Sequence, residues 1–409
     1  MKQMNGEYMQ WLPQGGVTSS RGWSASGVAC AIKSSNSDKK DLGLIYTEFP
    51  AEAAGVFTEN VFTAAPVLVT RERLKNRVHA VVVNSGNANA CVGERGIADA
   101  RRMTGLAAGR LGVPGDSVLV GSTGVIGQTL PMDNIEEGIT LAAEKLSEEG
   151  GGDAAESILT TDTAAKEAAC RVQGEEGAYT IGGMAKGAGM ICPNLATMLA
   201  FLTTDVEIDR ELLQVALRRA ADRSFNLISI DGDTSTNDTL LVMANGASGV
   251  KIKGEGPAFD RFCAALEEVC RDLAYRIVDD GEGATKVVAL KVKGAPDEES
   301  AGVLAKSVLN SLLVKTAFFG EDANWGRIFM ALGNAGVKFD PEKVDLYLGD
   351  VQVAASGQGL DFSEEEAARV LQCREVPVTV DLNQGDAELL SWGNDLSYEY
   401  VTINGSYRT

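Results

Sequence analysis

The stretch from Gly182 to Asp205 reads Gly-Gly-Met-Ala-Lys-Gly-Ala-Gly-Met-Ile-Cys-Pro-Asn-Leu-Ala-Thr-Met-Leu-Ala-Phe-Leu-Thr-Thr-Asp. Its first half holds four glycines and a proline. This composition predicts a non-repetitive loop, because glycine reaches positive φ and proline fixes φ and lacks an N–H donor. The second half, from Thr197, is a short apolar run typical of a strand buried on both faces. A hydroxyl therefore stands at a loop-to-strand junction, Ala196–Thr197, which suits both a nucleophile and a site where a chain cuts itself.

A plainer interpretation fits the same pattern, namely a glycine loop that feeds a core strand. The stretch by itself does not separate these two interpretations. A chemical role for Thr197 depends on which groups the remainder of the chain supplies.

Composition places the chain among ordinary globular proteins, with 44% hydrophobic and 23% charged residues. A length of 409 residues predicts two or three packed units. The net charge of −20 at pH 7 argues against nucleic acid and anionic membranes as partners, because both require a basic face. With neither a signal-peptide pattern nor a run of 18 apolar residues, we expect a cytoplasmic protein with no membrane span.

Cysteine and histidine usage excludes several kinds of site. Seven cysteines occur without a Cys-x-x-Cys pair, which predicts reduced, mostly buried thiols and neither a zinc site nor a disulfide framework. Cys192 lies in the glycine-rich stretch, but without an evident base we expect it to be a small apolar filler. The single histidine, His79, precedes an apolar strand and is expected to be structural. We therefore predict no metal site, and a catalytic base other than histidine.

Helical and strand patterns are interspersed along the chain, which predicts an α/β or α+β fold with helices layered on mixed or antiparallel sheets. Several short β-like pieces are expected within residues 22–83, the last being the strand 78–83. Further strands are expected at 118–120, 240–243, 344–348, 376–380, 389–392 and 397–403. Helices are expected at 98–111, 134–146 with Asn134 as N-cap, 160–169, 209–223, 259–275 and 301–316. On composition alone, residues 291–300 are the best candidate for a domain boundary.

Three familiar motifs are ruled out by spacing or by residue type. Residues 183–189 lack the order Gly-x4-Gly-Lys-Ser/Thr of a phosphate loop, and residues 281–286 lack the dinucleotide-binding spacing. Residues 231–242 begin like a calcium loop, but Thr236 stands in place of the required glycine and Val242 in place of the required glutamate. What remains is a set of clusters rich in hydroxyl, amide and glycine groups, at 121–124, 160–163, 231–238 and 280–286, together with Asn404.

These clusters, with almost no histidine, suit a nucleophile activated by its own α-amine. A threonine hydroxyl is a poor nucleophile until its proton is removed. An α-amine has a pKa of about 8 and can act as general base near neutral pH. Freeing that amine requires cleavage before Thr197, and the same hydroxyl can attack the Ala196 carbonyl to give an ester that water then opens.

The segment Lys186-Gly-Ala-Gly-Met-Ile-Cys-Pro-Asn-Leu-Ala-Thr-Met-Leu resembles the self-cleaving segment of the ornithine acetyltransferase (glutamate N-acetyltransferase) family of arginine biosynthesis. Further blocks resemble that family in the same order and extend over essentially the whole chain, at 84–91, 122–127, 160–163, 231–238, 280–286, 319–327 and 392–404. Departures are confined to Cys192, Leu195 and the pair Gly405-Ser406, and none of them removes a proposed catalytic group.

The resemblance implies self-cleavage between Ala196 and Thr197 into an α chain of residues 1–196 and a β chain of residues 197–409. Thr197 would take the acetyl group of N2-acetylornithine as an ester and pass it to glutamate, with its α-amine as base. The Thr123 hydroxyl and the Gly124 N–H would hold the oxyanion.

The same resemblance implies that the substrate is bound by Thr160, Lys186, Thr197, Glu282, Asn404 and Thr409. The charges indicate how: Lys186 suits an α-carboxylate, and Glu282 suits an ammonium such as the ornithine δ-amine. Asn404 and Thr409 would donate hydrogen bonds from a C-terminal tail that closes the site. The residues leave open whether Thr160 or Thr161 faces the substrate.

For the fold, the resemblance implies a layered α/β sandwich of the N-terminal-nucleophile type over residues 1–284 and a smaller C-terminal α/β domain over residues 285–409. It also implies an α2β2 assembly without a cofactor. Some members of the family also use acetyl-CoA as acetyl donor to glutamate, and the residues do not decide this. Two other classes stay open: an aminopeptidase or amidase of related self-cleaving architecture, and a non-catalytic amino-acid-binding regulatory protein.

Overall fold

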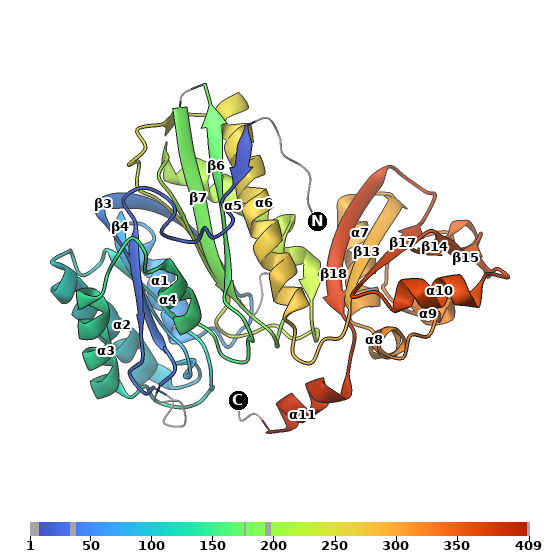
Figure 1. Ribbon diagram of the computed structural model, residues 1–409, viewed down its shortest axis with the longest axis horizontal. Coiled ribbons are helices and arrows are strands. Elements are labelled where there is room, and N and C mark those ends of the chain that lie inside the picture. Colours follow the sequence, from blue (N-terminus) through green and yellow to red (C-terminus); the bar gives the residue numbers. More distant parts are fainter. Residues whose placement is uncertain (1–7, 33–37, 176, 193–197, 407–409) are drawn as a thin grey trace.

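The computed structural model describes residues 8–32, 38–175, 177–192 and 198–406. A nine-stranded sheet occupies the N-terminal part and a seven-stranded sheet the C-terminal part, with a two-stranded sheet of β9 (Glu207–Ile208) and β12 (Lys251–Ile252) beside the first. Figure 1 shows the larger, N-terminal part on the left and the C-terminal sheet, in orange and red, on the right.

The nine-stranded sheet runs in the order β1-β6-β7-β8-β11-β3-β4-β5, with β2 added on β3. Two of its pairs are parallel, β8 with β11 and β4 with β5, and the others are antiparallel. The mixed sheet that the sequence predicts is therefore confirmed. The strands are β1 (Met9–Trp11), β2 (Ser24–Val28), β3 (Leu42–Phe57), β4 (Val78–Asn84), β5 (Val118–Ser122), β6 (Lys166–Gly174), β7 (Gly177–Lys186), β8 (Leu199–Thr204) and β11 (Thr239–Ala244).

Side-chain alternation shows that this sheet folds over on itself along the long strand β3. On β4, Val81 and Val83 belong to a central apolar core, whereas Ala80 and Val82 belong to an outer core under helices. On β8, Phe201 enters the same central core, while its neighbours along the strand face a second outer core. Because successive strand residues point to opposite faces, the two halves of the sheet must be stacked with the central core between them.

Helices cover the outside of both halves, so the layers follow the order helices, sheet, sheet, helices, as Figure 1 shows from left to right. Helices α2 and α3 pack on the half containing β2 to β5, and α5 and α6 on the half containing β6, β7 and β3. The predicted layered α/β sandwich is thus confirmed. The helices are α1 (Ala65–Arg73), α2 (Gly93–Leu111), α3 (Met132–Glu144), α4 (Gly151–Ser157), α5 (Arg210–Asp222) and α6 (Pro257–Asp279).

Helix α6 shows why such a segment becomes helical. Pro257 stands in its first turn, where a missing N–H costs nothing. Apolar side chains then recur every three or four residues and are completely buried, which places them on one face against the sheet. They are Phe259, Phe262, Leu266, Val269, Leu273 and Ile277.

The C-terminal sheet has the order β10-β18-β13-β17-β14-β15-β16. Its first strand, β10 (Ile228–Ser229), comes from the N-terminal part of the chain and pairs in parallel with β18. The other strands are β13 (Val287–Ala295), β14 (Asp345–Leu348), β15 (Val351–Ala355), β16 (Gln358–Gly359), β17 (Glu375–Asp381) and β18 (Ala387–Asn394). Residues 291–295 continue β13, so this piece of the compositional boundary candidate is not a linker. The boundary between residues 284 and 285 stays a prediction.

Helices of the C-terminal part are α7 (Glu298–Leu309), α8 (Leu312–Phe319), α9 (Trp325–Gly333), α10 (Glu364–Leu371) and α11 (Tyr398–Ser406). The single helix expected at 301–316 is divided into α7 and α8, because Ser311 leaves the helical geometry and caps α8 by accepting a hydrogen bond from the Val314 N–H. Within the described part of the chain, no helix alone is long and apolar enough to cross a membrane, and α7 with α8 passes that test only as a pair bent by 61°.

Two predictions of element type are wrong. The expected helix at 160–169 is a loop followed by β6, because pairing with β7 along all nine residues of β6 overrides the helical propensity of its alanines. The expected strand at 397–403 is helix α11, which has no buried residue. The alternation of apolar residues in this segment predicts a strand with one buried face, but no face of the segment is buried.

Other predictions fail in their details. Residues 182–186 continue β7 and are not part of the loop. Asn134 does not cap α3, because the helix begins at Met132 and the Asn134 amide donates to the carbonyls of Cys30 and Ala31. The sequence pattern does not predict helix α1. Strand β3 is one strand of 16 residues, whereas several short pieces are expected there. Only Cys170, Cys263 and Cys270 are buried, so the cysteines are not mostly buried.

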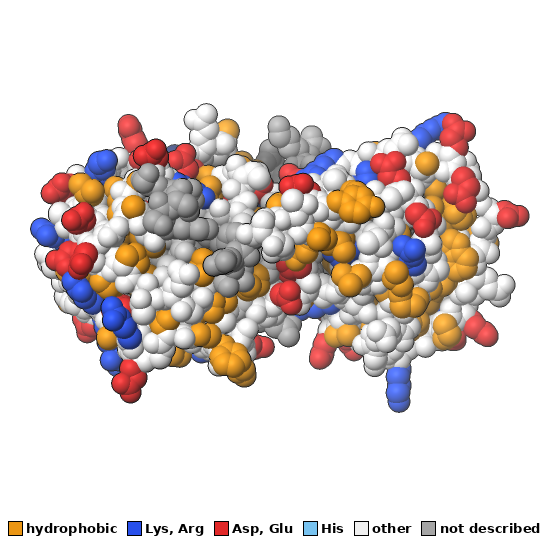
Figure 2. Space-filling model, turned by 90° about the horizontal axis from the view of Figure 1, so that it is seen from below, with side chains coloured by type: hydrophobic (Ala, Val, Ile, Leu, Met, Phe, Trp, Pro, Cys, Tyr) orange, Lys and Arg blue, Asp and Glu red, His pale blue; other side chains and the backbone are white. Residues whose placement is uncertain are grey.

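The surface carries both signs of charge. On the face drawn in Figure 2, Lys and Arg side chains lie scattered among Asp and Glu side chains, with hydrophobic groups exposed over both parts of the molecule. The largest exposed apolar side chains in the described C-terminal part include Tyr398, Leu312 and Val401. On this face the basic groups do not form one continuous stripe.

Candidate active site

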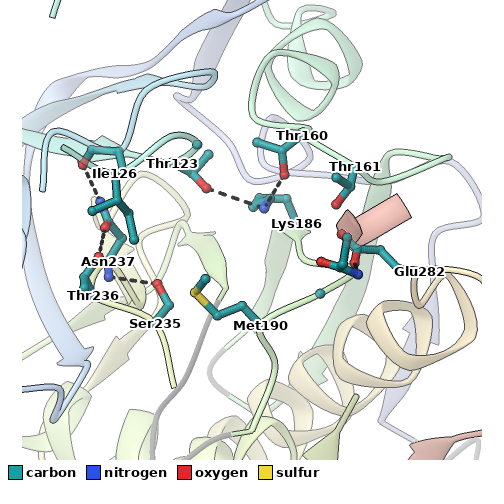
Figure 3. Close-up of a pocket in the computed structure, with 14 residues that line it drawn as sticks. Thr123, Ile126, Thr160, Thr161, Lys186, Met190, Ser235, Thr236, Asn237 and Glu282 are labelled. Carbon is teal, nitrogen blue, oxygen red and sulfur yellow. Dashed lines mark hydrogen bonds between the residues drawn. The ribbon is translucent and has the colours of Figure 1, made fainter. Parts of the chain in front are cut away.

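One pocket collects most of the residues that the sequence proposes as functional. Its lining includes Thr123, Gly124, Thr160, Lys186, Glu282 and Asn404, and the neighbouring Thr161. These residues come from segments far apart in the chain, and Figure 3 shows several of them facing the same space. Ala196, Thr197 and Thr409 lie outside the described residues.

Parallel strands β4 and β5 position one wall of the pocket, because their carboxyl ends meet at the same edge. Ser122, at the end of β5, donates from its hydroxyl to the Asn84 side-chain oxygen at 2.6 Å. The Thr123 N–H donates to the Asn84 carbonyl at 3.0 Å. The Asn84 amide in turn donates to the Asn87 carbonyl at 2.9 Å. Thr123 is therefore held by a hydrogen-bonded turn at the end of a buried strand.

Gly124 is required at its position for a steric reason. Its φ is +131°, and a Cβ atom placed there would lie 2.3 Å from the carbonyl carbon of Gly86. Only glycine allows the two loops to approach this closely. Within the described part of the chain no hydrogen-bond acceptor is assigned to the Gly124 N–H. The pocket wall thus combines a hydroxyl and a backbone N–H.

Asn237 ties this wall to the segment that precedes β11. Its amide nitrogen donates to the carbonyls of Ala88 and Ser122, at 2.6 and 2.8 Å. Its side-chain oxygen accepts from the Thr236 hydroxyl at 2.6 Å, and its N–H donates to the Ser235 hydroxyl at 3.0 Å. Asn237 thus bonds to the loop after β4 and to the end of β5. Because Asn237 itself precedes β11, these bonds join the two sheet halves at the pocket.

Lys186 ends β7 and points into the pocket, as Figure 3 shows. Its side chain is only 6% exposed. The ammonium donates to the Thr160 hydroxyl at 2.8 Å and lies 3.5 Å from the Thr123 hydroxyl oxygen. Burial lowers the pKa of Lys186, and attraction to Asp162, whose carboxylate is 3.8 Å away, opposes that shift.

Asp162 is the anchor of this arrangement, with a side chain that is 0% exposed. Its carboxylate accepts hydrogen bonds from the Lys166 ammonium at 2.7 Å, the Gly187 N–H at 2.7 Å and the Thr160 N–H at 3.1 Å. Burial by itself would raise the pKa of Asp162, but attraction to Lys186 and Lys166 outweighs it and holds the pKa well below its ordinary value.

Lys166 completes a row of alternating charges that ends at the partly buried Asp280. Its side chain is 2% exposed, and its ammonium also donates to the Asp280 carboxylate at 2.6 Å. Asp280 in turn accepts a hydrogen bond from the Thr163 N–H at 3.0 Å. The carboxylates and ammonium groups therefore compensate one another, which a buried charge requires.

Glu282 and Asn404 form the opposite wall. The Asn404 amide donates to the Glu282 carboxylate at 2.7 Å, and the Glu282 N–H donates to the Ala188 carbonyl at 2.8 Å. Asn404 reaches the pocket on α11, which Figure 1 shows running from the C-terminal sheet back beneath the N-terminal part. Tyr400, one turn earlier, donates from its hydroxyl to Asp231 at 3.2 Å.

The pocket therefore places a buried ammonium group and a carboxylate around one space, with hydroxyl, amide and backbone N–H groups between them. Such a set complements a small molecule that carries both an anionic and a cationic end. In the described part of the chain no group of three or more His, Cys, Asp or Glu residues could hold a metal ion. His79 and Cys192 do not line the pocket: the His79 ring nitrogen Nδ1 is 3.0 Å from the Thr47 carbonyl oxygen, and the Cys192 sulfur accepts from Asn310 at 3.3 Å.

The sequence does not single out several residues of the pocket. Met190, Ser235, Thr236 and Asn237 line the pocket, and the sequence indicates residues 231–238 only as a polar cluster. Asp162 belongs to the polar cluster 160–163, but its burial has no local signal. The sequence predicts a helix at Lys166, where a lysine is normally solvated, so it holds no sign of a buried ion pair.

A family model and two named relatives match almost the whole chain. A family model described as the ArgJ family matches residues 24–409. The chain is 53% identical to the arginine biosynthesis bifunctional protein ArgJ of Symbiobacterium thermophilum, over 98% of this chain and 100% of that protein. It is 48% identical to the protein of the same name from Thermotoga neapolitana, over 95% of this chain and 99% of that protein. A solved structure of ornithine acetyltransferase complexed with ornithine, from Mycobacterium tuberculosis, is 38% identical and covers 47% of this chain and 100% of that chain, with a TM-score of 0.43.

Replacing the buried carboxylate should destabilise the protein in a pH-dependent way. We expect Asp162→Asn to lower the free energy of unfolding at pH 7 by about 3–5 kcal/mol, because two buried ammonium groups lose their shared counter-charge. The folded-state pKa of Asp162 lies below its ordinary value of 3.8. The stabilisation is therefore present above about pH 4 and lost as the pH falls below it. Urea unfolding of both proteins from pH 7 to pH 3 measures this.

A matched control is Asp153→Asn, which removes an ion pair with Lys40 in which the Asp153 side chain is 57% exposed. Its effect at pH 7 should stay below about 1 kcal/mol. A pH-independent loss for Asp162→Asn, or a loss no larger than the control's, would contradict the assignment of Asp162 as a charged anchor.

Adding one methyl group at Gly189 should release the C-terminal helix. A Cβ there would lie 2.5 Å from the Glu282 carboxylate, so the carboxylate must move, and we expect its bond with Asn404 to weaken. Because α11 buries none of its residues, we expect Gly189→Ala to speed amide hydrogen exchange over residues 398–406 while leaving global stability nearly unchanged. Gly105→Ala is the control, since nothing lies within 4 Å of its added Cβ. Unchanged exchange in α11 would show that the Asn404–Glu282 contact does not hold the helix.

Proposed function

The chain belongs to the ArgJ family of arginine-biosynthesis acyltransferases, and we propose that it transfers an acetyl group from N2-acetyl-L-ornithine to L-glutamate. One observation carries this proposal. Six residues selected from the sequence for that chemistry, Thr123, Gly124, Thr160, Lys186, Glu282 and Asn404, line a single pocket. The products are L-ornithine and N-acetyl-L-glutamate.

The charges of the pocket support amino-acid substrates. Lys186 suits the α-carboxylate that acetylornithine and glutamate share, and Glu282 suits the δ-ammonium of ornithine. Asn404 bonds to the Glu282 carboxylate and lines the same space, so it lies within reach of a bound substrate. Thr160 and Thr161 both line the pocket, and we assign the contact with substrate to Thr160. Thr409 would complete the tail.

The proposed chemistry begins with cleavage between Ala196 and Thr197, two residues before β8. The Thr197 hydroxyl then attacks the acetyl carbonyl of acetylornithine while the Thr197 α-amine accepts its proton. Collapse of the tetrahedral intermediate breaks the C–N bond, and the departing ornithine amine takes that proton. The glutamate α-amine next attacks the Thr197 ester, which returns the hydroxyl and completes a ping-pong transfer.

Thr123 and Gly124 are proposed to stabilise the oxyanion in both steps. One donates an O–H group and the other a backbone N–H, the donor types that serve this purpose in acyl transfer. The strand ends and the close loop contact described above hold both groups in place. A preformed donor pair of this kind needs no rearrangement when charge develops, and each donor contributes on the order of 3 kcal/mol to the barrier.

Cleavage need not separate the two chains. Strand β7 precedes the proposed cleavage site and β8 follows it, and the two pair antiparallel from Ile181–Thr204 to Lys186–Leu199. Backbone hydrogen bonds across this pair, within a buried sheet, would keep the α and β chains together. We propose that two such units form an α2β2 assembly.

We expect Thr197→Ala to abolish both cleavage and transfer, because it removes the hydroxyl required for each. Mass spectrometry of the denatured proteins should find chains of residues 1–196 and 197–409 in the wild type and one intact chain in the variant. Thr316→Ala, an exposed position on α8, is the matched control and should be cleaved and active. An active wild type that remains one chain would refute the proposal, as would an acetyl label trapped on any residue other than Thr197.

We also propose that acetyl-CoA is a second acetyl donor, since the relatives at 53% and 48% identity are both named bifunctional. The thioester would acylate the same Thr197 hydroxyl, with CoA leaving as a thiol. We therefore expect N-acetylglutamate to form from acetyl-CoA and glutamate alone, and not with Thr197→Ala. Absence of product while acetylornithine is still consumed would limit the enzyme to acetyl recycling. Hydrolysis of peptide amides independent of glutamate would instead support a self-cleaving aminopeptidase or amidase.

A further inference from the structure

The Lys186 ammonium is surrounded by oxygen atoms of the protein itself. Thr160 Oγ1 is 2.8 Å from Nζ, Thr123 Oγ1 is 3.5 Å away and Asp162 Oδ2 is 3.8 Å away. An ammonium group has three N–H donors and no acceptor. Two hydroxyl oxygens and one carboxylate oxygen of the protein thus lie around the ammonium group, and Figure 3 shows the two hydroxyl contacts.

These contacts determine what the Thr123 hydroxyl can do. Because the ammonium can only donate, Thr123 Oγ1 must act as the acceptor in their contact. The single proton of that hydroxyl is then directed to another partner. Thr123 lines the pocket next to Gly124, so the proton is available to an oxygen atom bound there. By the same reasoning, Thr160 Oγ1 accepts from the Lys186 ammonium, and the proton of the Thr160 hydroxyl is directed to another partner.

The position of Lys186 is itself determined by a buried carboxylate. Asp162 accepts from the N–H of Gly187, the residue directly after Lys186, and its other oxygen lies beside the Lys186 ammonium. It also accepts from the N–H of Thr160, whose hydroxyl contacts the same ammonium. Asp162 therefore holds the backbone and the charged end of Lys186 together with the Thr160 loop, while Lys166 balances its charge.

Resting on the acetyl transfer proposed above, we infer that Lys186 is a positioning residue for Thr123. Held by Asp162, its ammonium fixes the Thr123 hydroxyl as a donor to the oxyanion. This role is separate from binding a substrate carboxylate. It predicts that Lys186 affects the chemical step and acts through Thr123.

Kinetics of Lys186→Met, Thr123→Val and the double variant test the inference. Each single change should lower kcat about 100-fold or more, because an oxyanion donor is lost or misdirected. The double variant should be about as slow as Thr123→Val alone, since residues that act as a unit are not additive. Lys253→Met, at an exposed position, controls for loss of a lysine and should leave kcat unchanged.

Two outcomes would overturn the inference. An unchanged kcat in Lys186→Met with weaker ornithine binding, measured by calorimetry, would make Lys186 a carboxylate-binding residue only. Multiplicative losses in the double variant would show that Lys186 and Thr123 act independently.

A measurement without turnover separates failure of this inference from failure of the proposed function. In nitrogen-15 NMR spectra of lysine-labelled protein, the Lys186 ammonium signal is assigned by its disappearance in Lys186→Met. We expect this signal to shift and its protons to exchange faster in Thr123→Val. An unchanged signal would refute the contact even in an active enzyme. If the wild type transfers no acetyl group, the function fails, and the NMR result still decides whether Lys186 positions Thr123.

Discussion

The buried carboxylate of Asp162 is the interaction on which the pocket depends. It lies between two lysines and accepts hydrogen bonds from Lys166, Gly187 and Thr160. A carboxylate with no exposed surface is tolerated only when opposite charges and N–H donors replace the water it has lost. These partners come from the loop before β6, from β6 itself and from the end of β7. One side chain therefore fixes the relative positions of three segments, and two of them carry pocket residues.

The sandwich explains why the pocket forms where it does. Thr123 and Gly124 follow a strand of one sheet half, whereas Lys186 and Asn237 belong to strands or loops of the other. Stacking the halves around the central core brings these ends to one edge, and the bonds from Asn237 to Ala88 and Ser122 join them there. Polar groups held by rigid strands need little reorganisation when a charged intermediate forms.

The wall made by α11 is held by fewer buried contacts than the strand ends on the other side of the pocket. It buries none of its own residues and is held by contacts such as Asn404 with Glu282 and Tyr400 with Asp231. Segments with few buried contacts open at a lower free-energy cost than core elements. The pocket thus combines a rigid floor, which carries the groups proposed for chemistry, with a lightly held side formed by the C-terminal part of the chain.

The sequence by itself determined the interspersed helices and strands, the apolar strand after Thr197 and the long helix α6, because burial of one face leaves a periodic pattern. Resemblance of its polar blocks to a family selected six residues that line one pocket. Only the tertiary structure decided that residues 166–174 form a strand and residues 398–406 a helix, since pairing with β7 and the absence of a covered face are not local properties. It also decided that Lys166 and Asp162 are buried partners, because compensation of charge depends on which segments meet in space.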